Sequence, residues 1–222
     1  YWLSGFPLYP GNPGALQRIE EGERIGNFYT FEYAGVDEEG GWLIYSKDGQ
    51  KIPIAEGTDE DKKVVGNGLP KFSMSMTHAF RYKNFDLNLY FRGNFGYQIY
   101  DAQDLYYGLQ NAAPNTNVLE SAYNENQHIT GTNVHSSYFV HNGNFLKLDV
   151  ATLGYTWNCG SKWLEKARFY ITGRNLFTIS GYHRGLDKDA YCVNGMEPGV
   201  PYSKNGYYPS SRQFLFGVQL NF

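Results

Sequence analysis

The sequence predicts an all-β protein whose antiparallel strands form part of a large transmembrane β-barrel, with long extracellular loops and short periplasmic turns. Three observations predict this class. Apolar and polar residues alternate over several stretches, long and short connections follow one another in turn, and the chain is rich in aromatic residues and glycine. A barrel wall that faces lipid on one side and polar contents on the other requires such alternation.

The last eleven residues, 212–222, give the clearest strand. One parity is apolar throughout and consists of Phe214, Phe216, Val218, Leu220 and Phe222. The other parity is polar or glycine, except at Leu215. The length of this segment and its closing aromatic residue suit a tilted membrane-spanning strand of about 9–11 residues.

A hairpin is predicted in the middle of the chain. Residues 72–82 and 85–95 both alternate between apolar and polar side chains. Only Lys83-Asn84 separates them, which is the loop length of a tight β-hairpin.

Three further strands are predicted. Residues 145–157 alternate with a change of phase, which a β-bulge near Ala151-Thr152 explains. Residues 167–174 alternate again, and a weaker strand covers residues 26–35.

The connections between these strands alternate in length. The long ones are 36–71, 97–144 and 177–211, and the short ones are 83–84 and 158–166. Outer-membrane barrels have this asymmetry, with short periplasmic turns and long outer loops. The pattern therefore predicts that the strand ending at Phe222 runs from the outside to the periplasm.

Charge and hydropathy exclude several classes of protein. The 222 residues contain 19 Lys and Arg against 22 Asp and Glu, which argues against nucleic acid as a partner. No apolar run reaches the length of a membrane-spanning helix. The chain starts without Met and without a signal peptide, so we expect a piece of a longer protein or a processed product.

Several stretches resemble the end of the SusC/RagA family of TonB-dependent outer-membrane transporters. They have the family's order and spacing and comprise Glu21–Tyr29 with Gly35–Asp37, Val65–Lys71, Tyr82–Leu87, Ser137–Leu148 with Leu153–Thr156, Tyr170–Phe177 with Tyr182, Gly185 and Asp187, and Tyr208–Arg212 with the closing Phe222. The chain departs from the family at Lys188 and Asp189, where Pro-Glu is usual, and at Lys147, where Arg is usual.

The resemblance implies that residues 1–222 are the C-terminal portion of a TonB-dependent receptor barrel in the cell outer membrane. The plug domain and the N-terminal strands would lie upstream. The family imports glycans or peptides with a SusD-like surface lipoprotein and takes energy from TonB, which acts through the N-terminal part. The expected partners are therefore that lipoprotein, TonB, an oligosaccharide or peptide ligand, and outer-membrane lipid.

Under this interpretation two sets of residues have assigned places. Phe222 would serve as an assembly signal for insertion into the membrane. The polar residues of the strands would face the lumen or hydrogen-bond the plug, and they are Asp86, Asn88, Arg92, Asn94, Arg168, Thr172 and Arg174.

Aromatic residues in the long loops are candidates for contact with substrate or partner. They are Trp42, Tyr106, Tyr107 and Tyr123. Sugars stack on aromatic faces because one side of the ring is rich in C–H groups. The competing interpretation is that these loop aromatics pack against the loops themselves.

No motif indicates catalysis, a cofactor or a metal site. The five histidines lack the spacing of a metal site, and no nucleophile motif accompanies His183 and Asp187. We therefore expect no enzyme. The alternative to transport is a soluble all-β carbohydrate-binding module, in which the apolar faces of the strands would turn inward.

Overall fold

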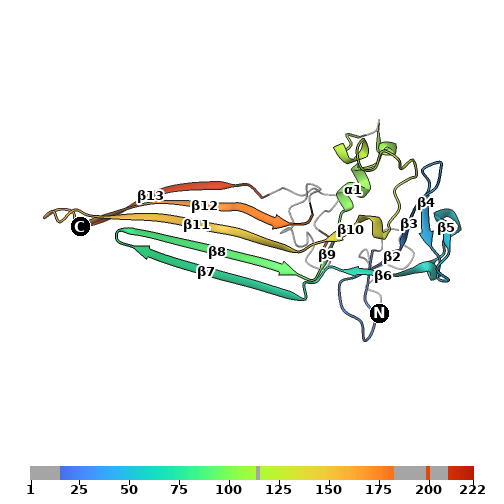
Figure 1. Ribbon diagram of the computed structural model, residues 1–222, viewed down its shortest axis with the longest axis horizontal. Helices are drawn as coiled ribbons and strands as arrows, with labels where there is room; N and C mark the ends of the chain where they lie inside the picture. Colours follow the sequence, from blue (N-terminus) through green and yellow to red (C-terminus); the bar gives the residue numbers. More distant parts are fainter. Residues whose placement is uncertain (1–15, 114–115, 183–198, 201–209) are drawn as a thin grey trace. The chain divides into compact units, whose positions relative to one another are not determined.

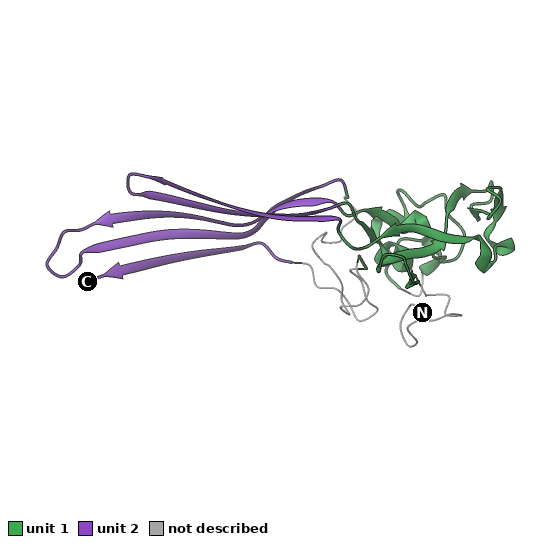
Figure 2. Cartoon of the chain, turned by 90° about the horizontal axis from the view of Figure 1, so that it is seen from below, with its two compact units in different colours: residues 1–70, 96–143, 182–207 green, residues 71–95, 144–181, 208–222 purple. Residues whose placement is uncertain are grey.

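The computed structural model describes residues 16–113, 116–182, 199–200 and 210–222. The chain divides into two compact units, which Figure 2 shows in two colours. Unit 1 consists of residues 1–70, 96–143 and 182–207, and unit 2 consists of residues 71–95, 144–181 and 208–222. Each unit is described separately below.

Unit 2 is a single antiparallel sheet of five long strands (Figure 1). The strands are β7 (Phe72–Tyr82), β8 (Phe85–Phe95), β11 (Phe145–Asn158), β12 (Lys166–Ser180) and β13 (Gln213–Asn221). Their order in the sheet is β13-β12-β11-β8-β7. The alternation in the sequence predicted all five, and it placed β7 and β8 at their observed bounds.

Both short turns lie at the same end of this sheet. Lys83 and Asn84 join β7 to β8, and residues 159–165 join β11 to β12. Lys83 has φ of 52°, a left-handed conformation that tight hairpin turns require and that residues other than glycine seldom adopt. The three segments of unit 1 are all inserted at the opposite strand ends, so the predicted division into short and long connections is confirmed.

The register gives the sheet one apolar face. Tyr82 pairs with Phe85, which pairs with Tyr155, and further along the strands Phe91 and Phe177 flank Leu148. We call the surface formed by this parity of the five strands the apolar face. His78 lies on it, and its ring stacks on Phe80 with a centroid distance of 5.9 Å.

Tyrosine and tryptophan gather near the turn end of the apolar face. Tyr82, Tyr155 and Trp157 are exposed there, and Trp163 of the adjoining turn is 79% exposed. Such side chains prefer a membrane–water interface because they combine an apolar ring with a polar tip. Eleven residues at about 3.3 Å each, tilted by about 40°, span about 28 Å, close to the apolar band of an outer-membrane barrel.

The predicted bulge in β11 is real, but the predicted position was wrong. The register shifts between Leu148 and Val150, so Asp149, rather than Ala151 or Thr152, is the extra residue against β8. Against β12 the irregularity is on the partner strand, where Asn175 and Leu176 lie opposite Asp149. The carboxylate of Asp149 accepts a hydrogen bond from Arg92, which explains why the ladder opens there. Val150 consequently moves off the apolar face, and Ala151 takes its place.

The described part of unit 1 contains three small antiparallel sheets and one short helix (Figure 1). Its strands are β1 (Gln17–Arg18), β2 (Asn27–Phe31), β3 (Tyr33–Val36), β4 (Trp42–Tyr45), β5 (Lys51–Pro53), β6 (Lys62–Asn67), β9 (Gln98–Tyr100) and β10 (Val140–Asn142). The helix α1 is Ala102–Tyr107, and 3-10 turns cover Ile54–Glu56, Asp59–Asp61, Gln110–Ala112, Glu120–Ala122 and Ser137–Phe139. The sequence predicted only the region of β2 and β3.

A hydrophobic core joins the segments of unit 1. Phe28, Trp42, Tyr100 and Phe139 come from distant parts of the chain and are between 0% and 3% exposed. Their rings meet in tilted or edge-on contacts, for example Trp42 and Phe139 with centroids 5.9 Å apart. The long loops 36–71 and 97–144 are therefore folded structures, which the alternation of apolar and polar residues did not reveal.

A buried polar network fixes helix α1 in this unit. The Asp101 carboxylate caps the helix by accepting a hydrogen bond of 2.8 Å from the Asp104 backbone N–H. The Asp104 carboxylate in turn accepts from the Ser121 hydroxyl at 2.5 Å and from the Asn126 amide at 3.2 Å. Because buried polar groups are costly unless they are paired, this network specifies one arrangement of the 97–144 segment.

His135 makes the folding of unit 1 dependent on pH. Its Nδ1 lies 2.7 Å from the Tyr100 hydroxyl, and burial, followed by the charge of Lys62, lowers its pKa to about 4. The folded state thus binds fewer protons than the unfolded state below the usual pKa of about 6.5. The free energy of unfolding therefore has its full value above about pH 6.5. It falls by up to about 3 kcal/mol as the pH is lowered towards 4, because the unfolded state takes up a proton that the folded state does not.

We expect amide hydrogen exchange in residues 97–107, corrected for the intrinsic rate, to become faster as the pH is lowered from about 6.5 to about 4. Substitution of His135→Phe should flatten this dependence, because the protonated group is removed. His128→Gln is the matched control, since His128 is an exposed histidine in the same segment. Equal pH dependence in both variants and the unmodified protein would rule out this role of His135.

Candidate functional site

The residues predicted to face the lumen all lie on one surface of unit 2, which we call the polar face. It is formed by the strand positions opposite to the apolar face, and its rows are set by the pairs Asp86–Gly154, Asn88–Thr152, Thr152–Thr172 and Val150–Arg174. Arg92, Asn94 and Arg168 follow at the same parity. That this face lines a lumen remains a prediction.

An ion pair crosses the polar face near the turn end. The Nε and Nη2 of Arg168 donate to the two carboxylate oxygens of Asp86 at 3.0 and 2.6 Å. These residues belong to β12 and β8, and Gly154 of β11 lies between them. A Cβ at Gly154 would meet the Asp86 carboxylate and the Arg168 guanidinium, so the pair forms because this position is glycine.

A second side chain covers a glycine of the adjacent strand. The ring of Tyr170 covers Gly217 of β13, where an added Cβ would overlap it. The guanidinium of Arg168 lies 5.1 Å from the centre of that ring, within the range of a cation–π contact. The side chains of Asp86, Arg168 and Tyr170 lie over Gly154 and Gly217 and so link the strands β8, β11, β12 and β13.

Further side-chain contacts lie on the polar face. The hydroxyls of Thr152 and Thr172 are 2.8 Å apart and hydrogen-bond across β11 and β12. Nearer the loop end, Asp149 accepts from Arg92, and its Oδ1 lies 3.7 Å from Nζ of Lys147. Lys147 is only 2% exposed, so its charge is held close to this carboxylate.

Sequence reasoning missed Gly154, Tyr170, Gly217 and Asp149 as parts of this arrangement. The two glycines were the available signal, because glycine in the interior of a strand often marks the close approach of another group. It also missed Asn175, which has φ of 54° and whose amide donates to the Ser210 and Ser211 carbonyl oxygens, both at 3.2 Å.

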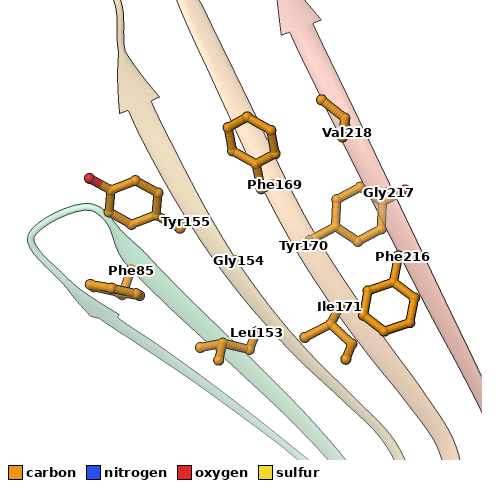
Figure 3. A pocket seen from close by; sticks show the side chains of 10 residues that line it. All are labelled: Phe85, Leu153, Gly154, Tyr155, Phe169, Tyr170, Ile171, Phe216, Gly217 and Val218. Carbon is orange, nitrogen blue, oxygen red and sulfur yellow. The ribbon is translucent and has the colours of Figure 1, made fainter.

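A shallow cavity of about 480 Å³ lies on the opposite side of the sheet (Figure 3). Its lining includes Phe85, Leu153, Phe169 and Phe216, all on the apolar face, and it contains no charged side chain. The cavity is therefore a concave part of the apolar face, and the polar side-chain groups of its lining are the hydroxyls of Tyr155 and Tyr170.

The four candidate aromatic contacts have different environments in unit 1. Trp42 is 3% exposed, and its indole N–H donates to the Thr132 carbonyl at 2.8 Å. It therefore belongs to the core, and its proposed contact with substrate is corrected. Tyr106 and Tyr123 are 43% and 57% exposed, and Tyr107 is half-buried.

Among residues 16–113, 116–182, 199–200 and 210–222, no three His, Cys, Asp or Glu side chains come together as metal ligands. Within the same residues, no helix has the length and hydrophobicity needed to cross a bilayer.

The chain is similar to known receptors over most of its length. It is 31% identical to TonB-dependent receptor P3 of Formosa agariphila, over 93% of this chain and 23% of the relative. It is 26% identical to TonB-dependent receptor SusC of Bacteroides thetaiotaomicron, over 100% of this chain and 22% of the relative. No family model matches the sequence.

The fold is found in a solved structure as well. All of the chain superimposes on 24% of a chain in the structure of the RagAB peptide transporter, with a TM-score of 0.75 and 22% identity. The chain belongs to the SusC/RagA-like TonB-dependent receptors. It spans about a quarter of the length of the relatives that it matches.

This membership confirms several of the expectations from sequence. SusC/RagA-like receptors are outer-membrane proteins and not enzymes, and the all-β antiparallel fold agrees with the RagAB match. It decides against the soluble carbohydrate-binding module, which used the same alternating strands with their apolar sides turned inward.

We expect Gly154→Val to lower the thermal stability of the receptor. Valine normally favours a strand, but here it would separate Asp86 from Arg168 at a cost on the order of 1 kcal/mol. The measurement is the temperature at which the full-length receptor in outer-membrane preparations loses its compact band on electrophoresis. Gly181→Val is the control, because an added Cβ at Gly181 meets nothing within 4 Å. A shift of the same size in both variants would show that the ion pair has no stabilising role.

Proposed function

We propose that this chain forms part of the wall and the outer loops of a TonB-dependent transporter that imports oligosaccharides or peptides together with a SusD-like surface lipoprotein. Residues 1–222 would be the C-terminal portion of its barrel. Because the chain spans 22–24% of its relatives, transport itself is a property of the longer receptor.

The distribution of charge in unit 2 carries the proposal. The described part of this unit contains ten Lys and Arg and three Asp and Glu, and none of them lies on the apolar face. They occupy the polar face, the turns or the residues flanking the strands. A charged side chain on the lipid side of a barrel is costly, whereas an apolar surface exposed to water has no such reason to exclude charge completely.

The edges of the sheet support a larger barrel. β7 and β13 each have one side without a partner strand among the described residues. Unpaired backbone groups are not tolerated in lipid, so each edge requires another strand. Five strands cannot close a wide barrel, and the remaining strands would come from the part of the receptor outside this chain.

Unit 1 would supply the outer surface of the transporter. Its segments are inserted at the strand ends that carry the long connections, and its core holds them in a fixed fold. Tyr106, Tyr107 and Tyr123 are the aromatic residues that we propose for contact with cargo or with the lipoprotein. TonB would act through the N-terminal part of the receptor.

The RagAB structure is that of a peptide transporter, whereas the name of the SusC relative specifies no substrate. Uptake assays therefore need both kinds of cargo. We expect cells that lack the receptor to lose uptake of a labelled oligosaccharide or peptide, and complementation with a Tyr106→Ala/Tyr123→Ala receptor to restore it only partly. Trimming exposed aromatic contacts should reduce uptake at low cargo concentration more than maximal uptake. Full uptake by the double variant would remove these tyrosines from the proposal, and unchanged uptake without the receptor would overturn the transport function.

Phe222 provides a separate prediction about assembly. It extends the apolar parity of β13 and is 88% exposed. We expect Phe222→Ala to lower the amount of receptor in the outer-membrane fraction more than Phe214→Ala, which removes an equivalent apolar ring from the same face. Quantitative blotting of membrane fractions measures this. Equal losses would mean that Phe222 acts as a lipid contact without a role in assembly.

A further inference from the structure

The turn end of the sheet in unit 2 combines cations with exposed aromatic rings. The ammonium of Lys83 lies 5.4 Å from the centre of the Tyr82 ring, which belongs to the apolar face. Lys162 is exposed in the turn between β11 and β12, next to the exposed Trp163. We call Lys83 and Lys162 the turn lysines. Their two turns are neighbours because β8 pairs with β11, so both cations lie beside one end of the apolar face.

The turn lysines are not neutralised within the described part of the chain. The acidic residue of the two turns is Glu165, which pairs with Lys166 at 3.3 Å. Arg81, at the end of β7, lies opposite Asp86 in the ladder and is attracted by its charge. Neither turn lysine forms an ion pair with a described carboxylate. An anion from outside the described residues is therefore their complement.

The cavity on the apolar face begins directly beside these turns. Phe85 and Tyr155 form one side of it, with ring centroids 4.9 Å apart. Phe216 of β13 lies on the other side, and Leu153 and Ile171 lie between them (Figure 3). The volume of about 480 Å³ is within the range of about 300–1,000 Å³ that is usual for small-molecule sites. One residue separates the nearer turn lysine from Phe85, so the cations and the cavity share a continuous surface.

We propose that the turn end of the apolar face binds one anionic glycerophospholipid, with an acyl chain in the cavity and the phosphate of the headgroup at the turn lysines. The inference rests on the proposed function, in which the apolar face contacts lipid. Each observation identifies one part of the ligand. The turn lysines require an anion at the membrane surface, and the cavity, whose lining carries no charge, requires an apolar chain below it.

The depth of the cavity agrees with this arrangement. Tyr155 and Leu153 lie two and four residues from Trp157, which is exposed near the turn end. At about 3.3 Å per residue, the cavity starts about 7 Å from the level of Trp157 and continues to about 13 Å. The Tyr155 hydroxyl is the polar group of the lining nearest the turns, and it can donate a hydrogen bond to an ester carbonyl of the lipid.

A lipid fits these features better than a second protein does. In a phospholipid the anionic headgroup and the acyl chain are joined in the same order in which the turn lysines and the cavity follow along the strands. A flexible chain also adapts to a shallow hollow between aromatic rings. A protein surface would have to match the projecting ring of Phe216, which is 77% exposed, and would have to supply a carboxylate at the turns.

The test uses the full-length receptor, purified and placed in phosphatidylcholine vesicles. The vesicles contain a trace of either phosphatidylglycerol or phosphatidylcholine that carries a photoreactive group on one acyl chain, and mass spectrometry identifies the labelled peptides. We expect phosphatidylglycerol to label the segments 153–157 and 169–171 more strongly. The preference should be about fivefold for each turn lysine, because a lysine near a membrane surface attracts anionic lipid by about that factor.

Variants of the turn lysines test the headgroup contact. Lys83→Gln/Lys162→Gln should abolish the preference for phosphatidylglycerol, and Lys83→Arg/Lys162→Arg should retain it. Lys71→Gln/Arg212→Gln is the matched control, because it removes two exposed cations at the opposite strand ends.

A further variant fills the cavity. Ile171→Trp should lower the labelling of both segments with either lipid, because the indole ring takes the space of the acyl chain. Leu89→Trp is its control, since Leu89 belongs to the apolar face but does not line the cavity. A photoreactive amino acid at Phe216, in outer membranes, tests the occupant directly, and we expect it to crosslink to phospholipid.

Four outcomes would overturn the inference: no labelling of the cavity segments, equal labelling by the two lipids, no response to Ile171→Trp, or a crosslink from position 216 to a second receptor copy or another protein. A receptor that reaches the outer membrane and imports cargo, but gives one of these results, keeps the proposed function and loses the lipid site. Absence from the outer membrane would contradict the proposed function and, with it, the lipid site.

Discussion

The antiparallel register of the five-stranded sheet is the constraint on which the rest of unit 2 depends. Since side chains alternate between faces, a slip of one residue in any strand would move its charged residues to the apolar face. Asp149 permits the one change of phase that β11 needs, and its carboxylate is held by Arg92. The Asp86–Arg168 pair above Gly154 links strands that are not neighbours and so opposes a slip of β11 between them.

The near balance of charge in the whole chain conceals two units of opposite sign. Among the described residues, unit 1 has a net charge of −10 and unit 2 of +7. In unit 2 the charges are confined to the polar face, the turns and the strand flanks, which an amphipathic wall requires. The overall charge of the chain does not show this division, which becomes visible only when the register assigns each charged residue to a face or a turn.

The sequence was sufficient for the long strands and insufficient for the long loops, for physical reasons. A strand of nine to fifteen residues with one apolar face has a period that is visible in the sequence, as in β7, β8 and β13. The strands of unit 1 have two to six residues and depend on a core assembled from Phe28, Trp42 and Phe139. Trp42 therefore looked like an exposed loop aromatic, although it is buried by a segment about 90 residues further along the chain.

The two units also differ in what stabilises them. Unit 1 contains its own core and a satisfied polar network around Asp101 and Asp104, so its fold is determined by its own residues. The sheet of unit 2 has large exposed apolar residues on one face, charged and polar residues on the other and, among the described residues, two edges without partner strands. The exposed apolar face and the unpaired edges are costly in water and become favourable only with lipid and further strands. The sheet is thus a segment of a barrel wall, and its stability depends on the lipid and the strands around it. The alternation of apolar and polar residues made the strands visible in the sequence, and the apolar face that it creates is the reason that the sheet needs the rest of a barrel.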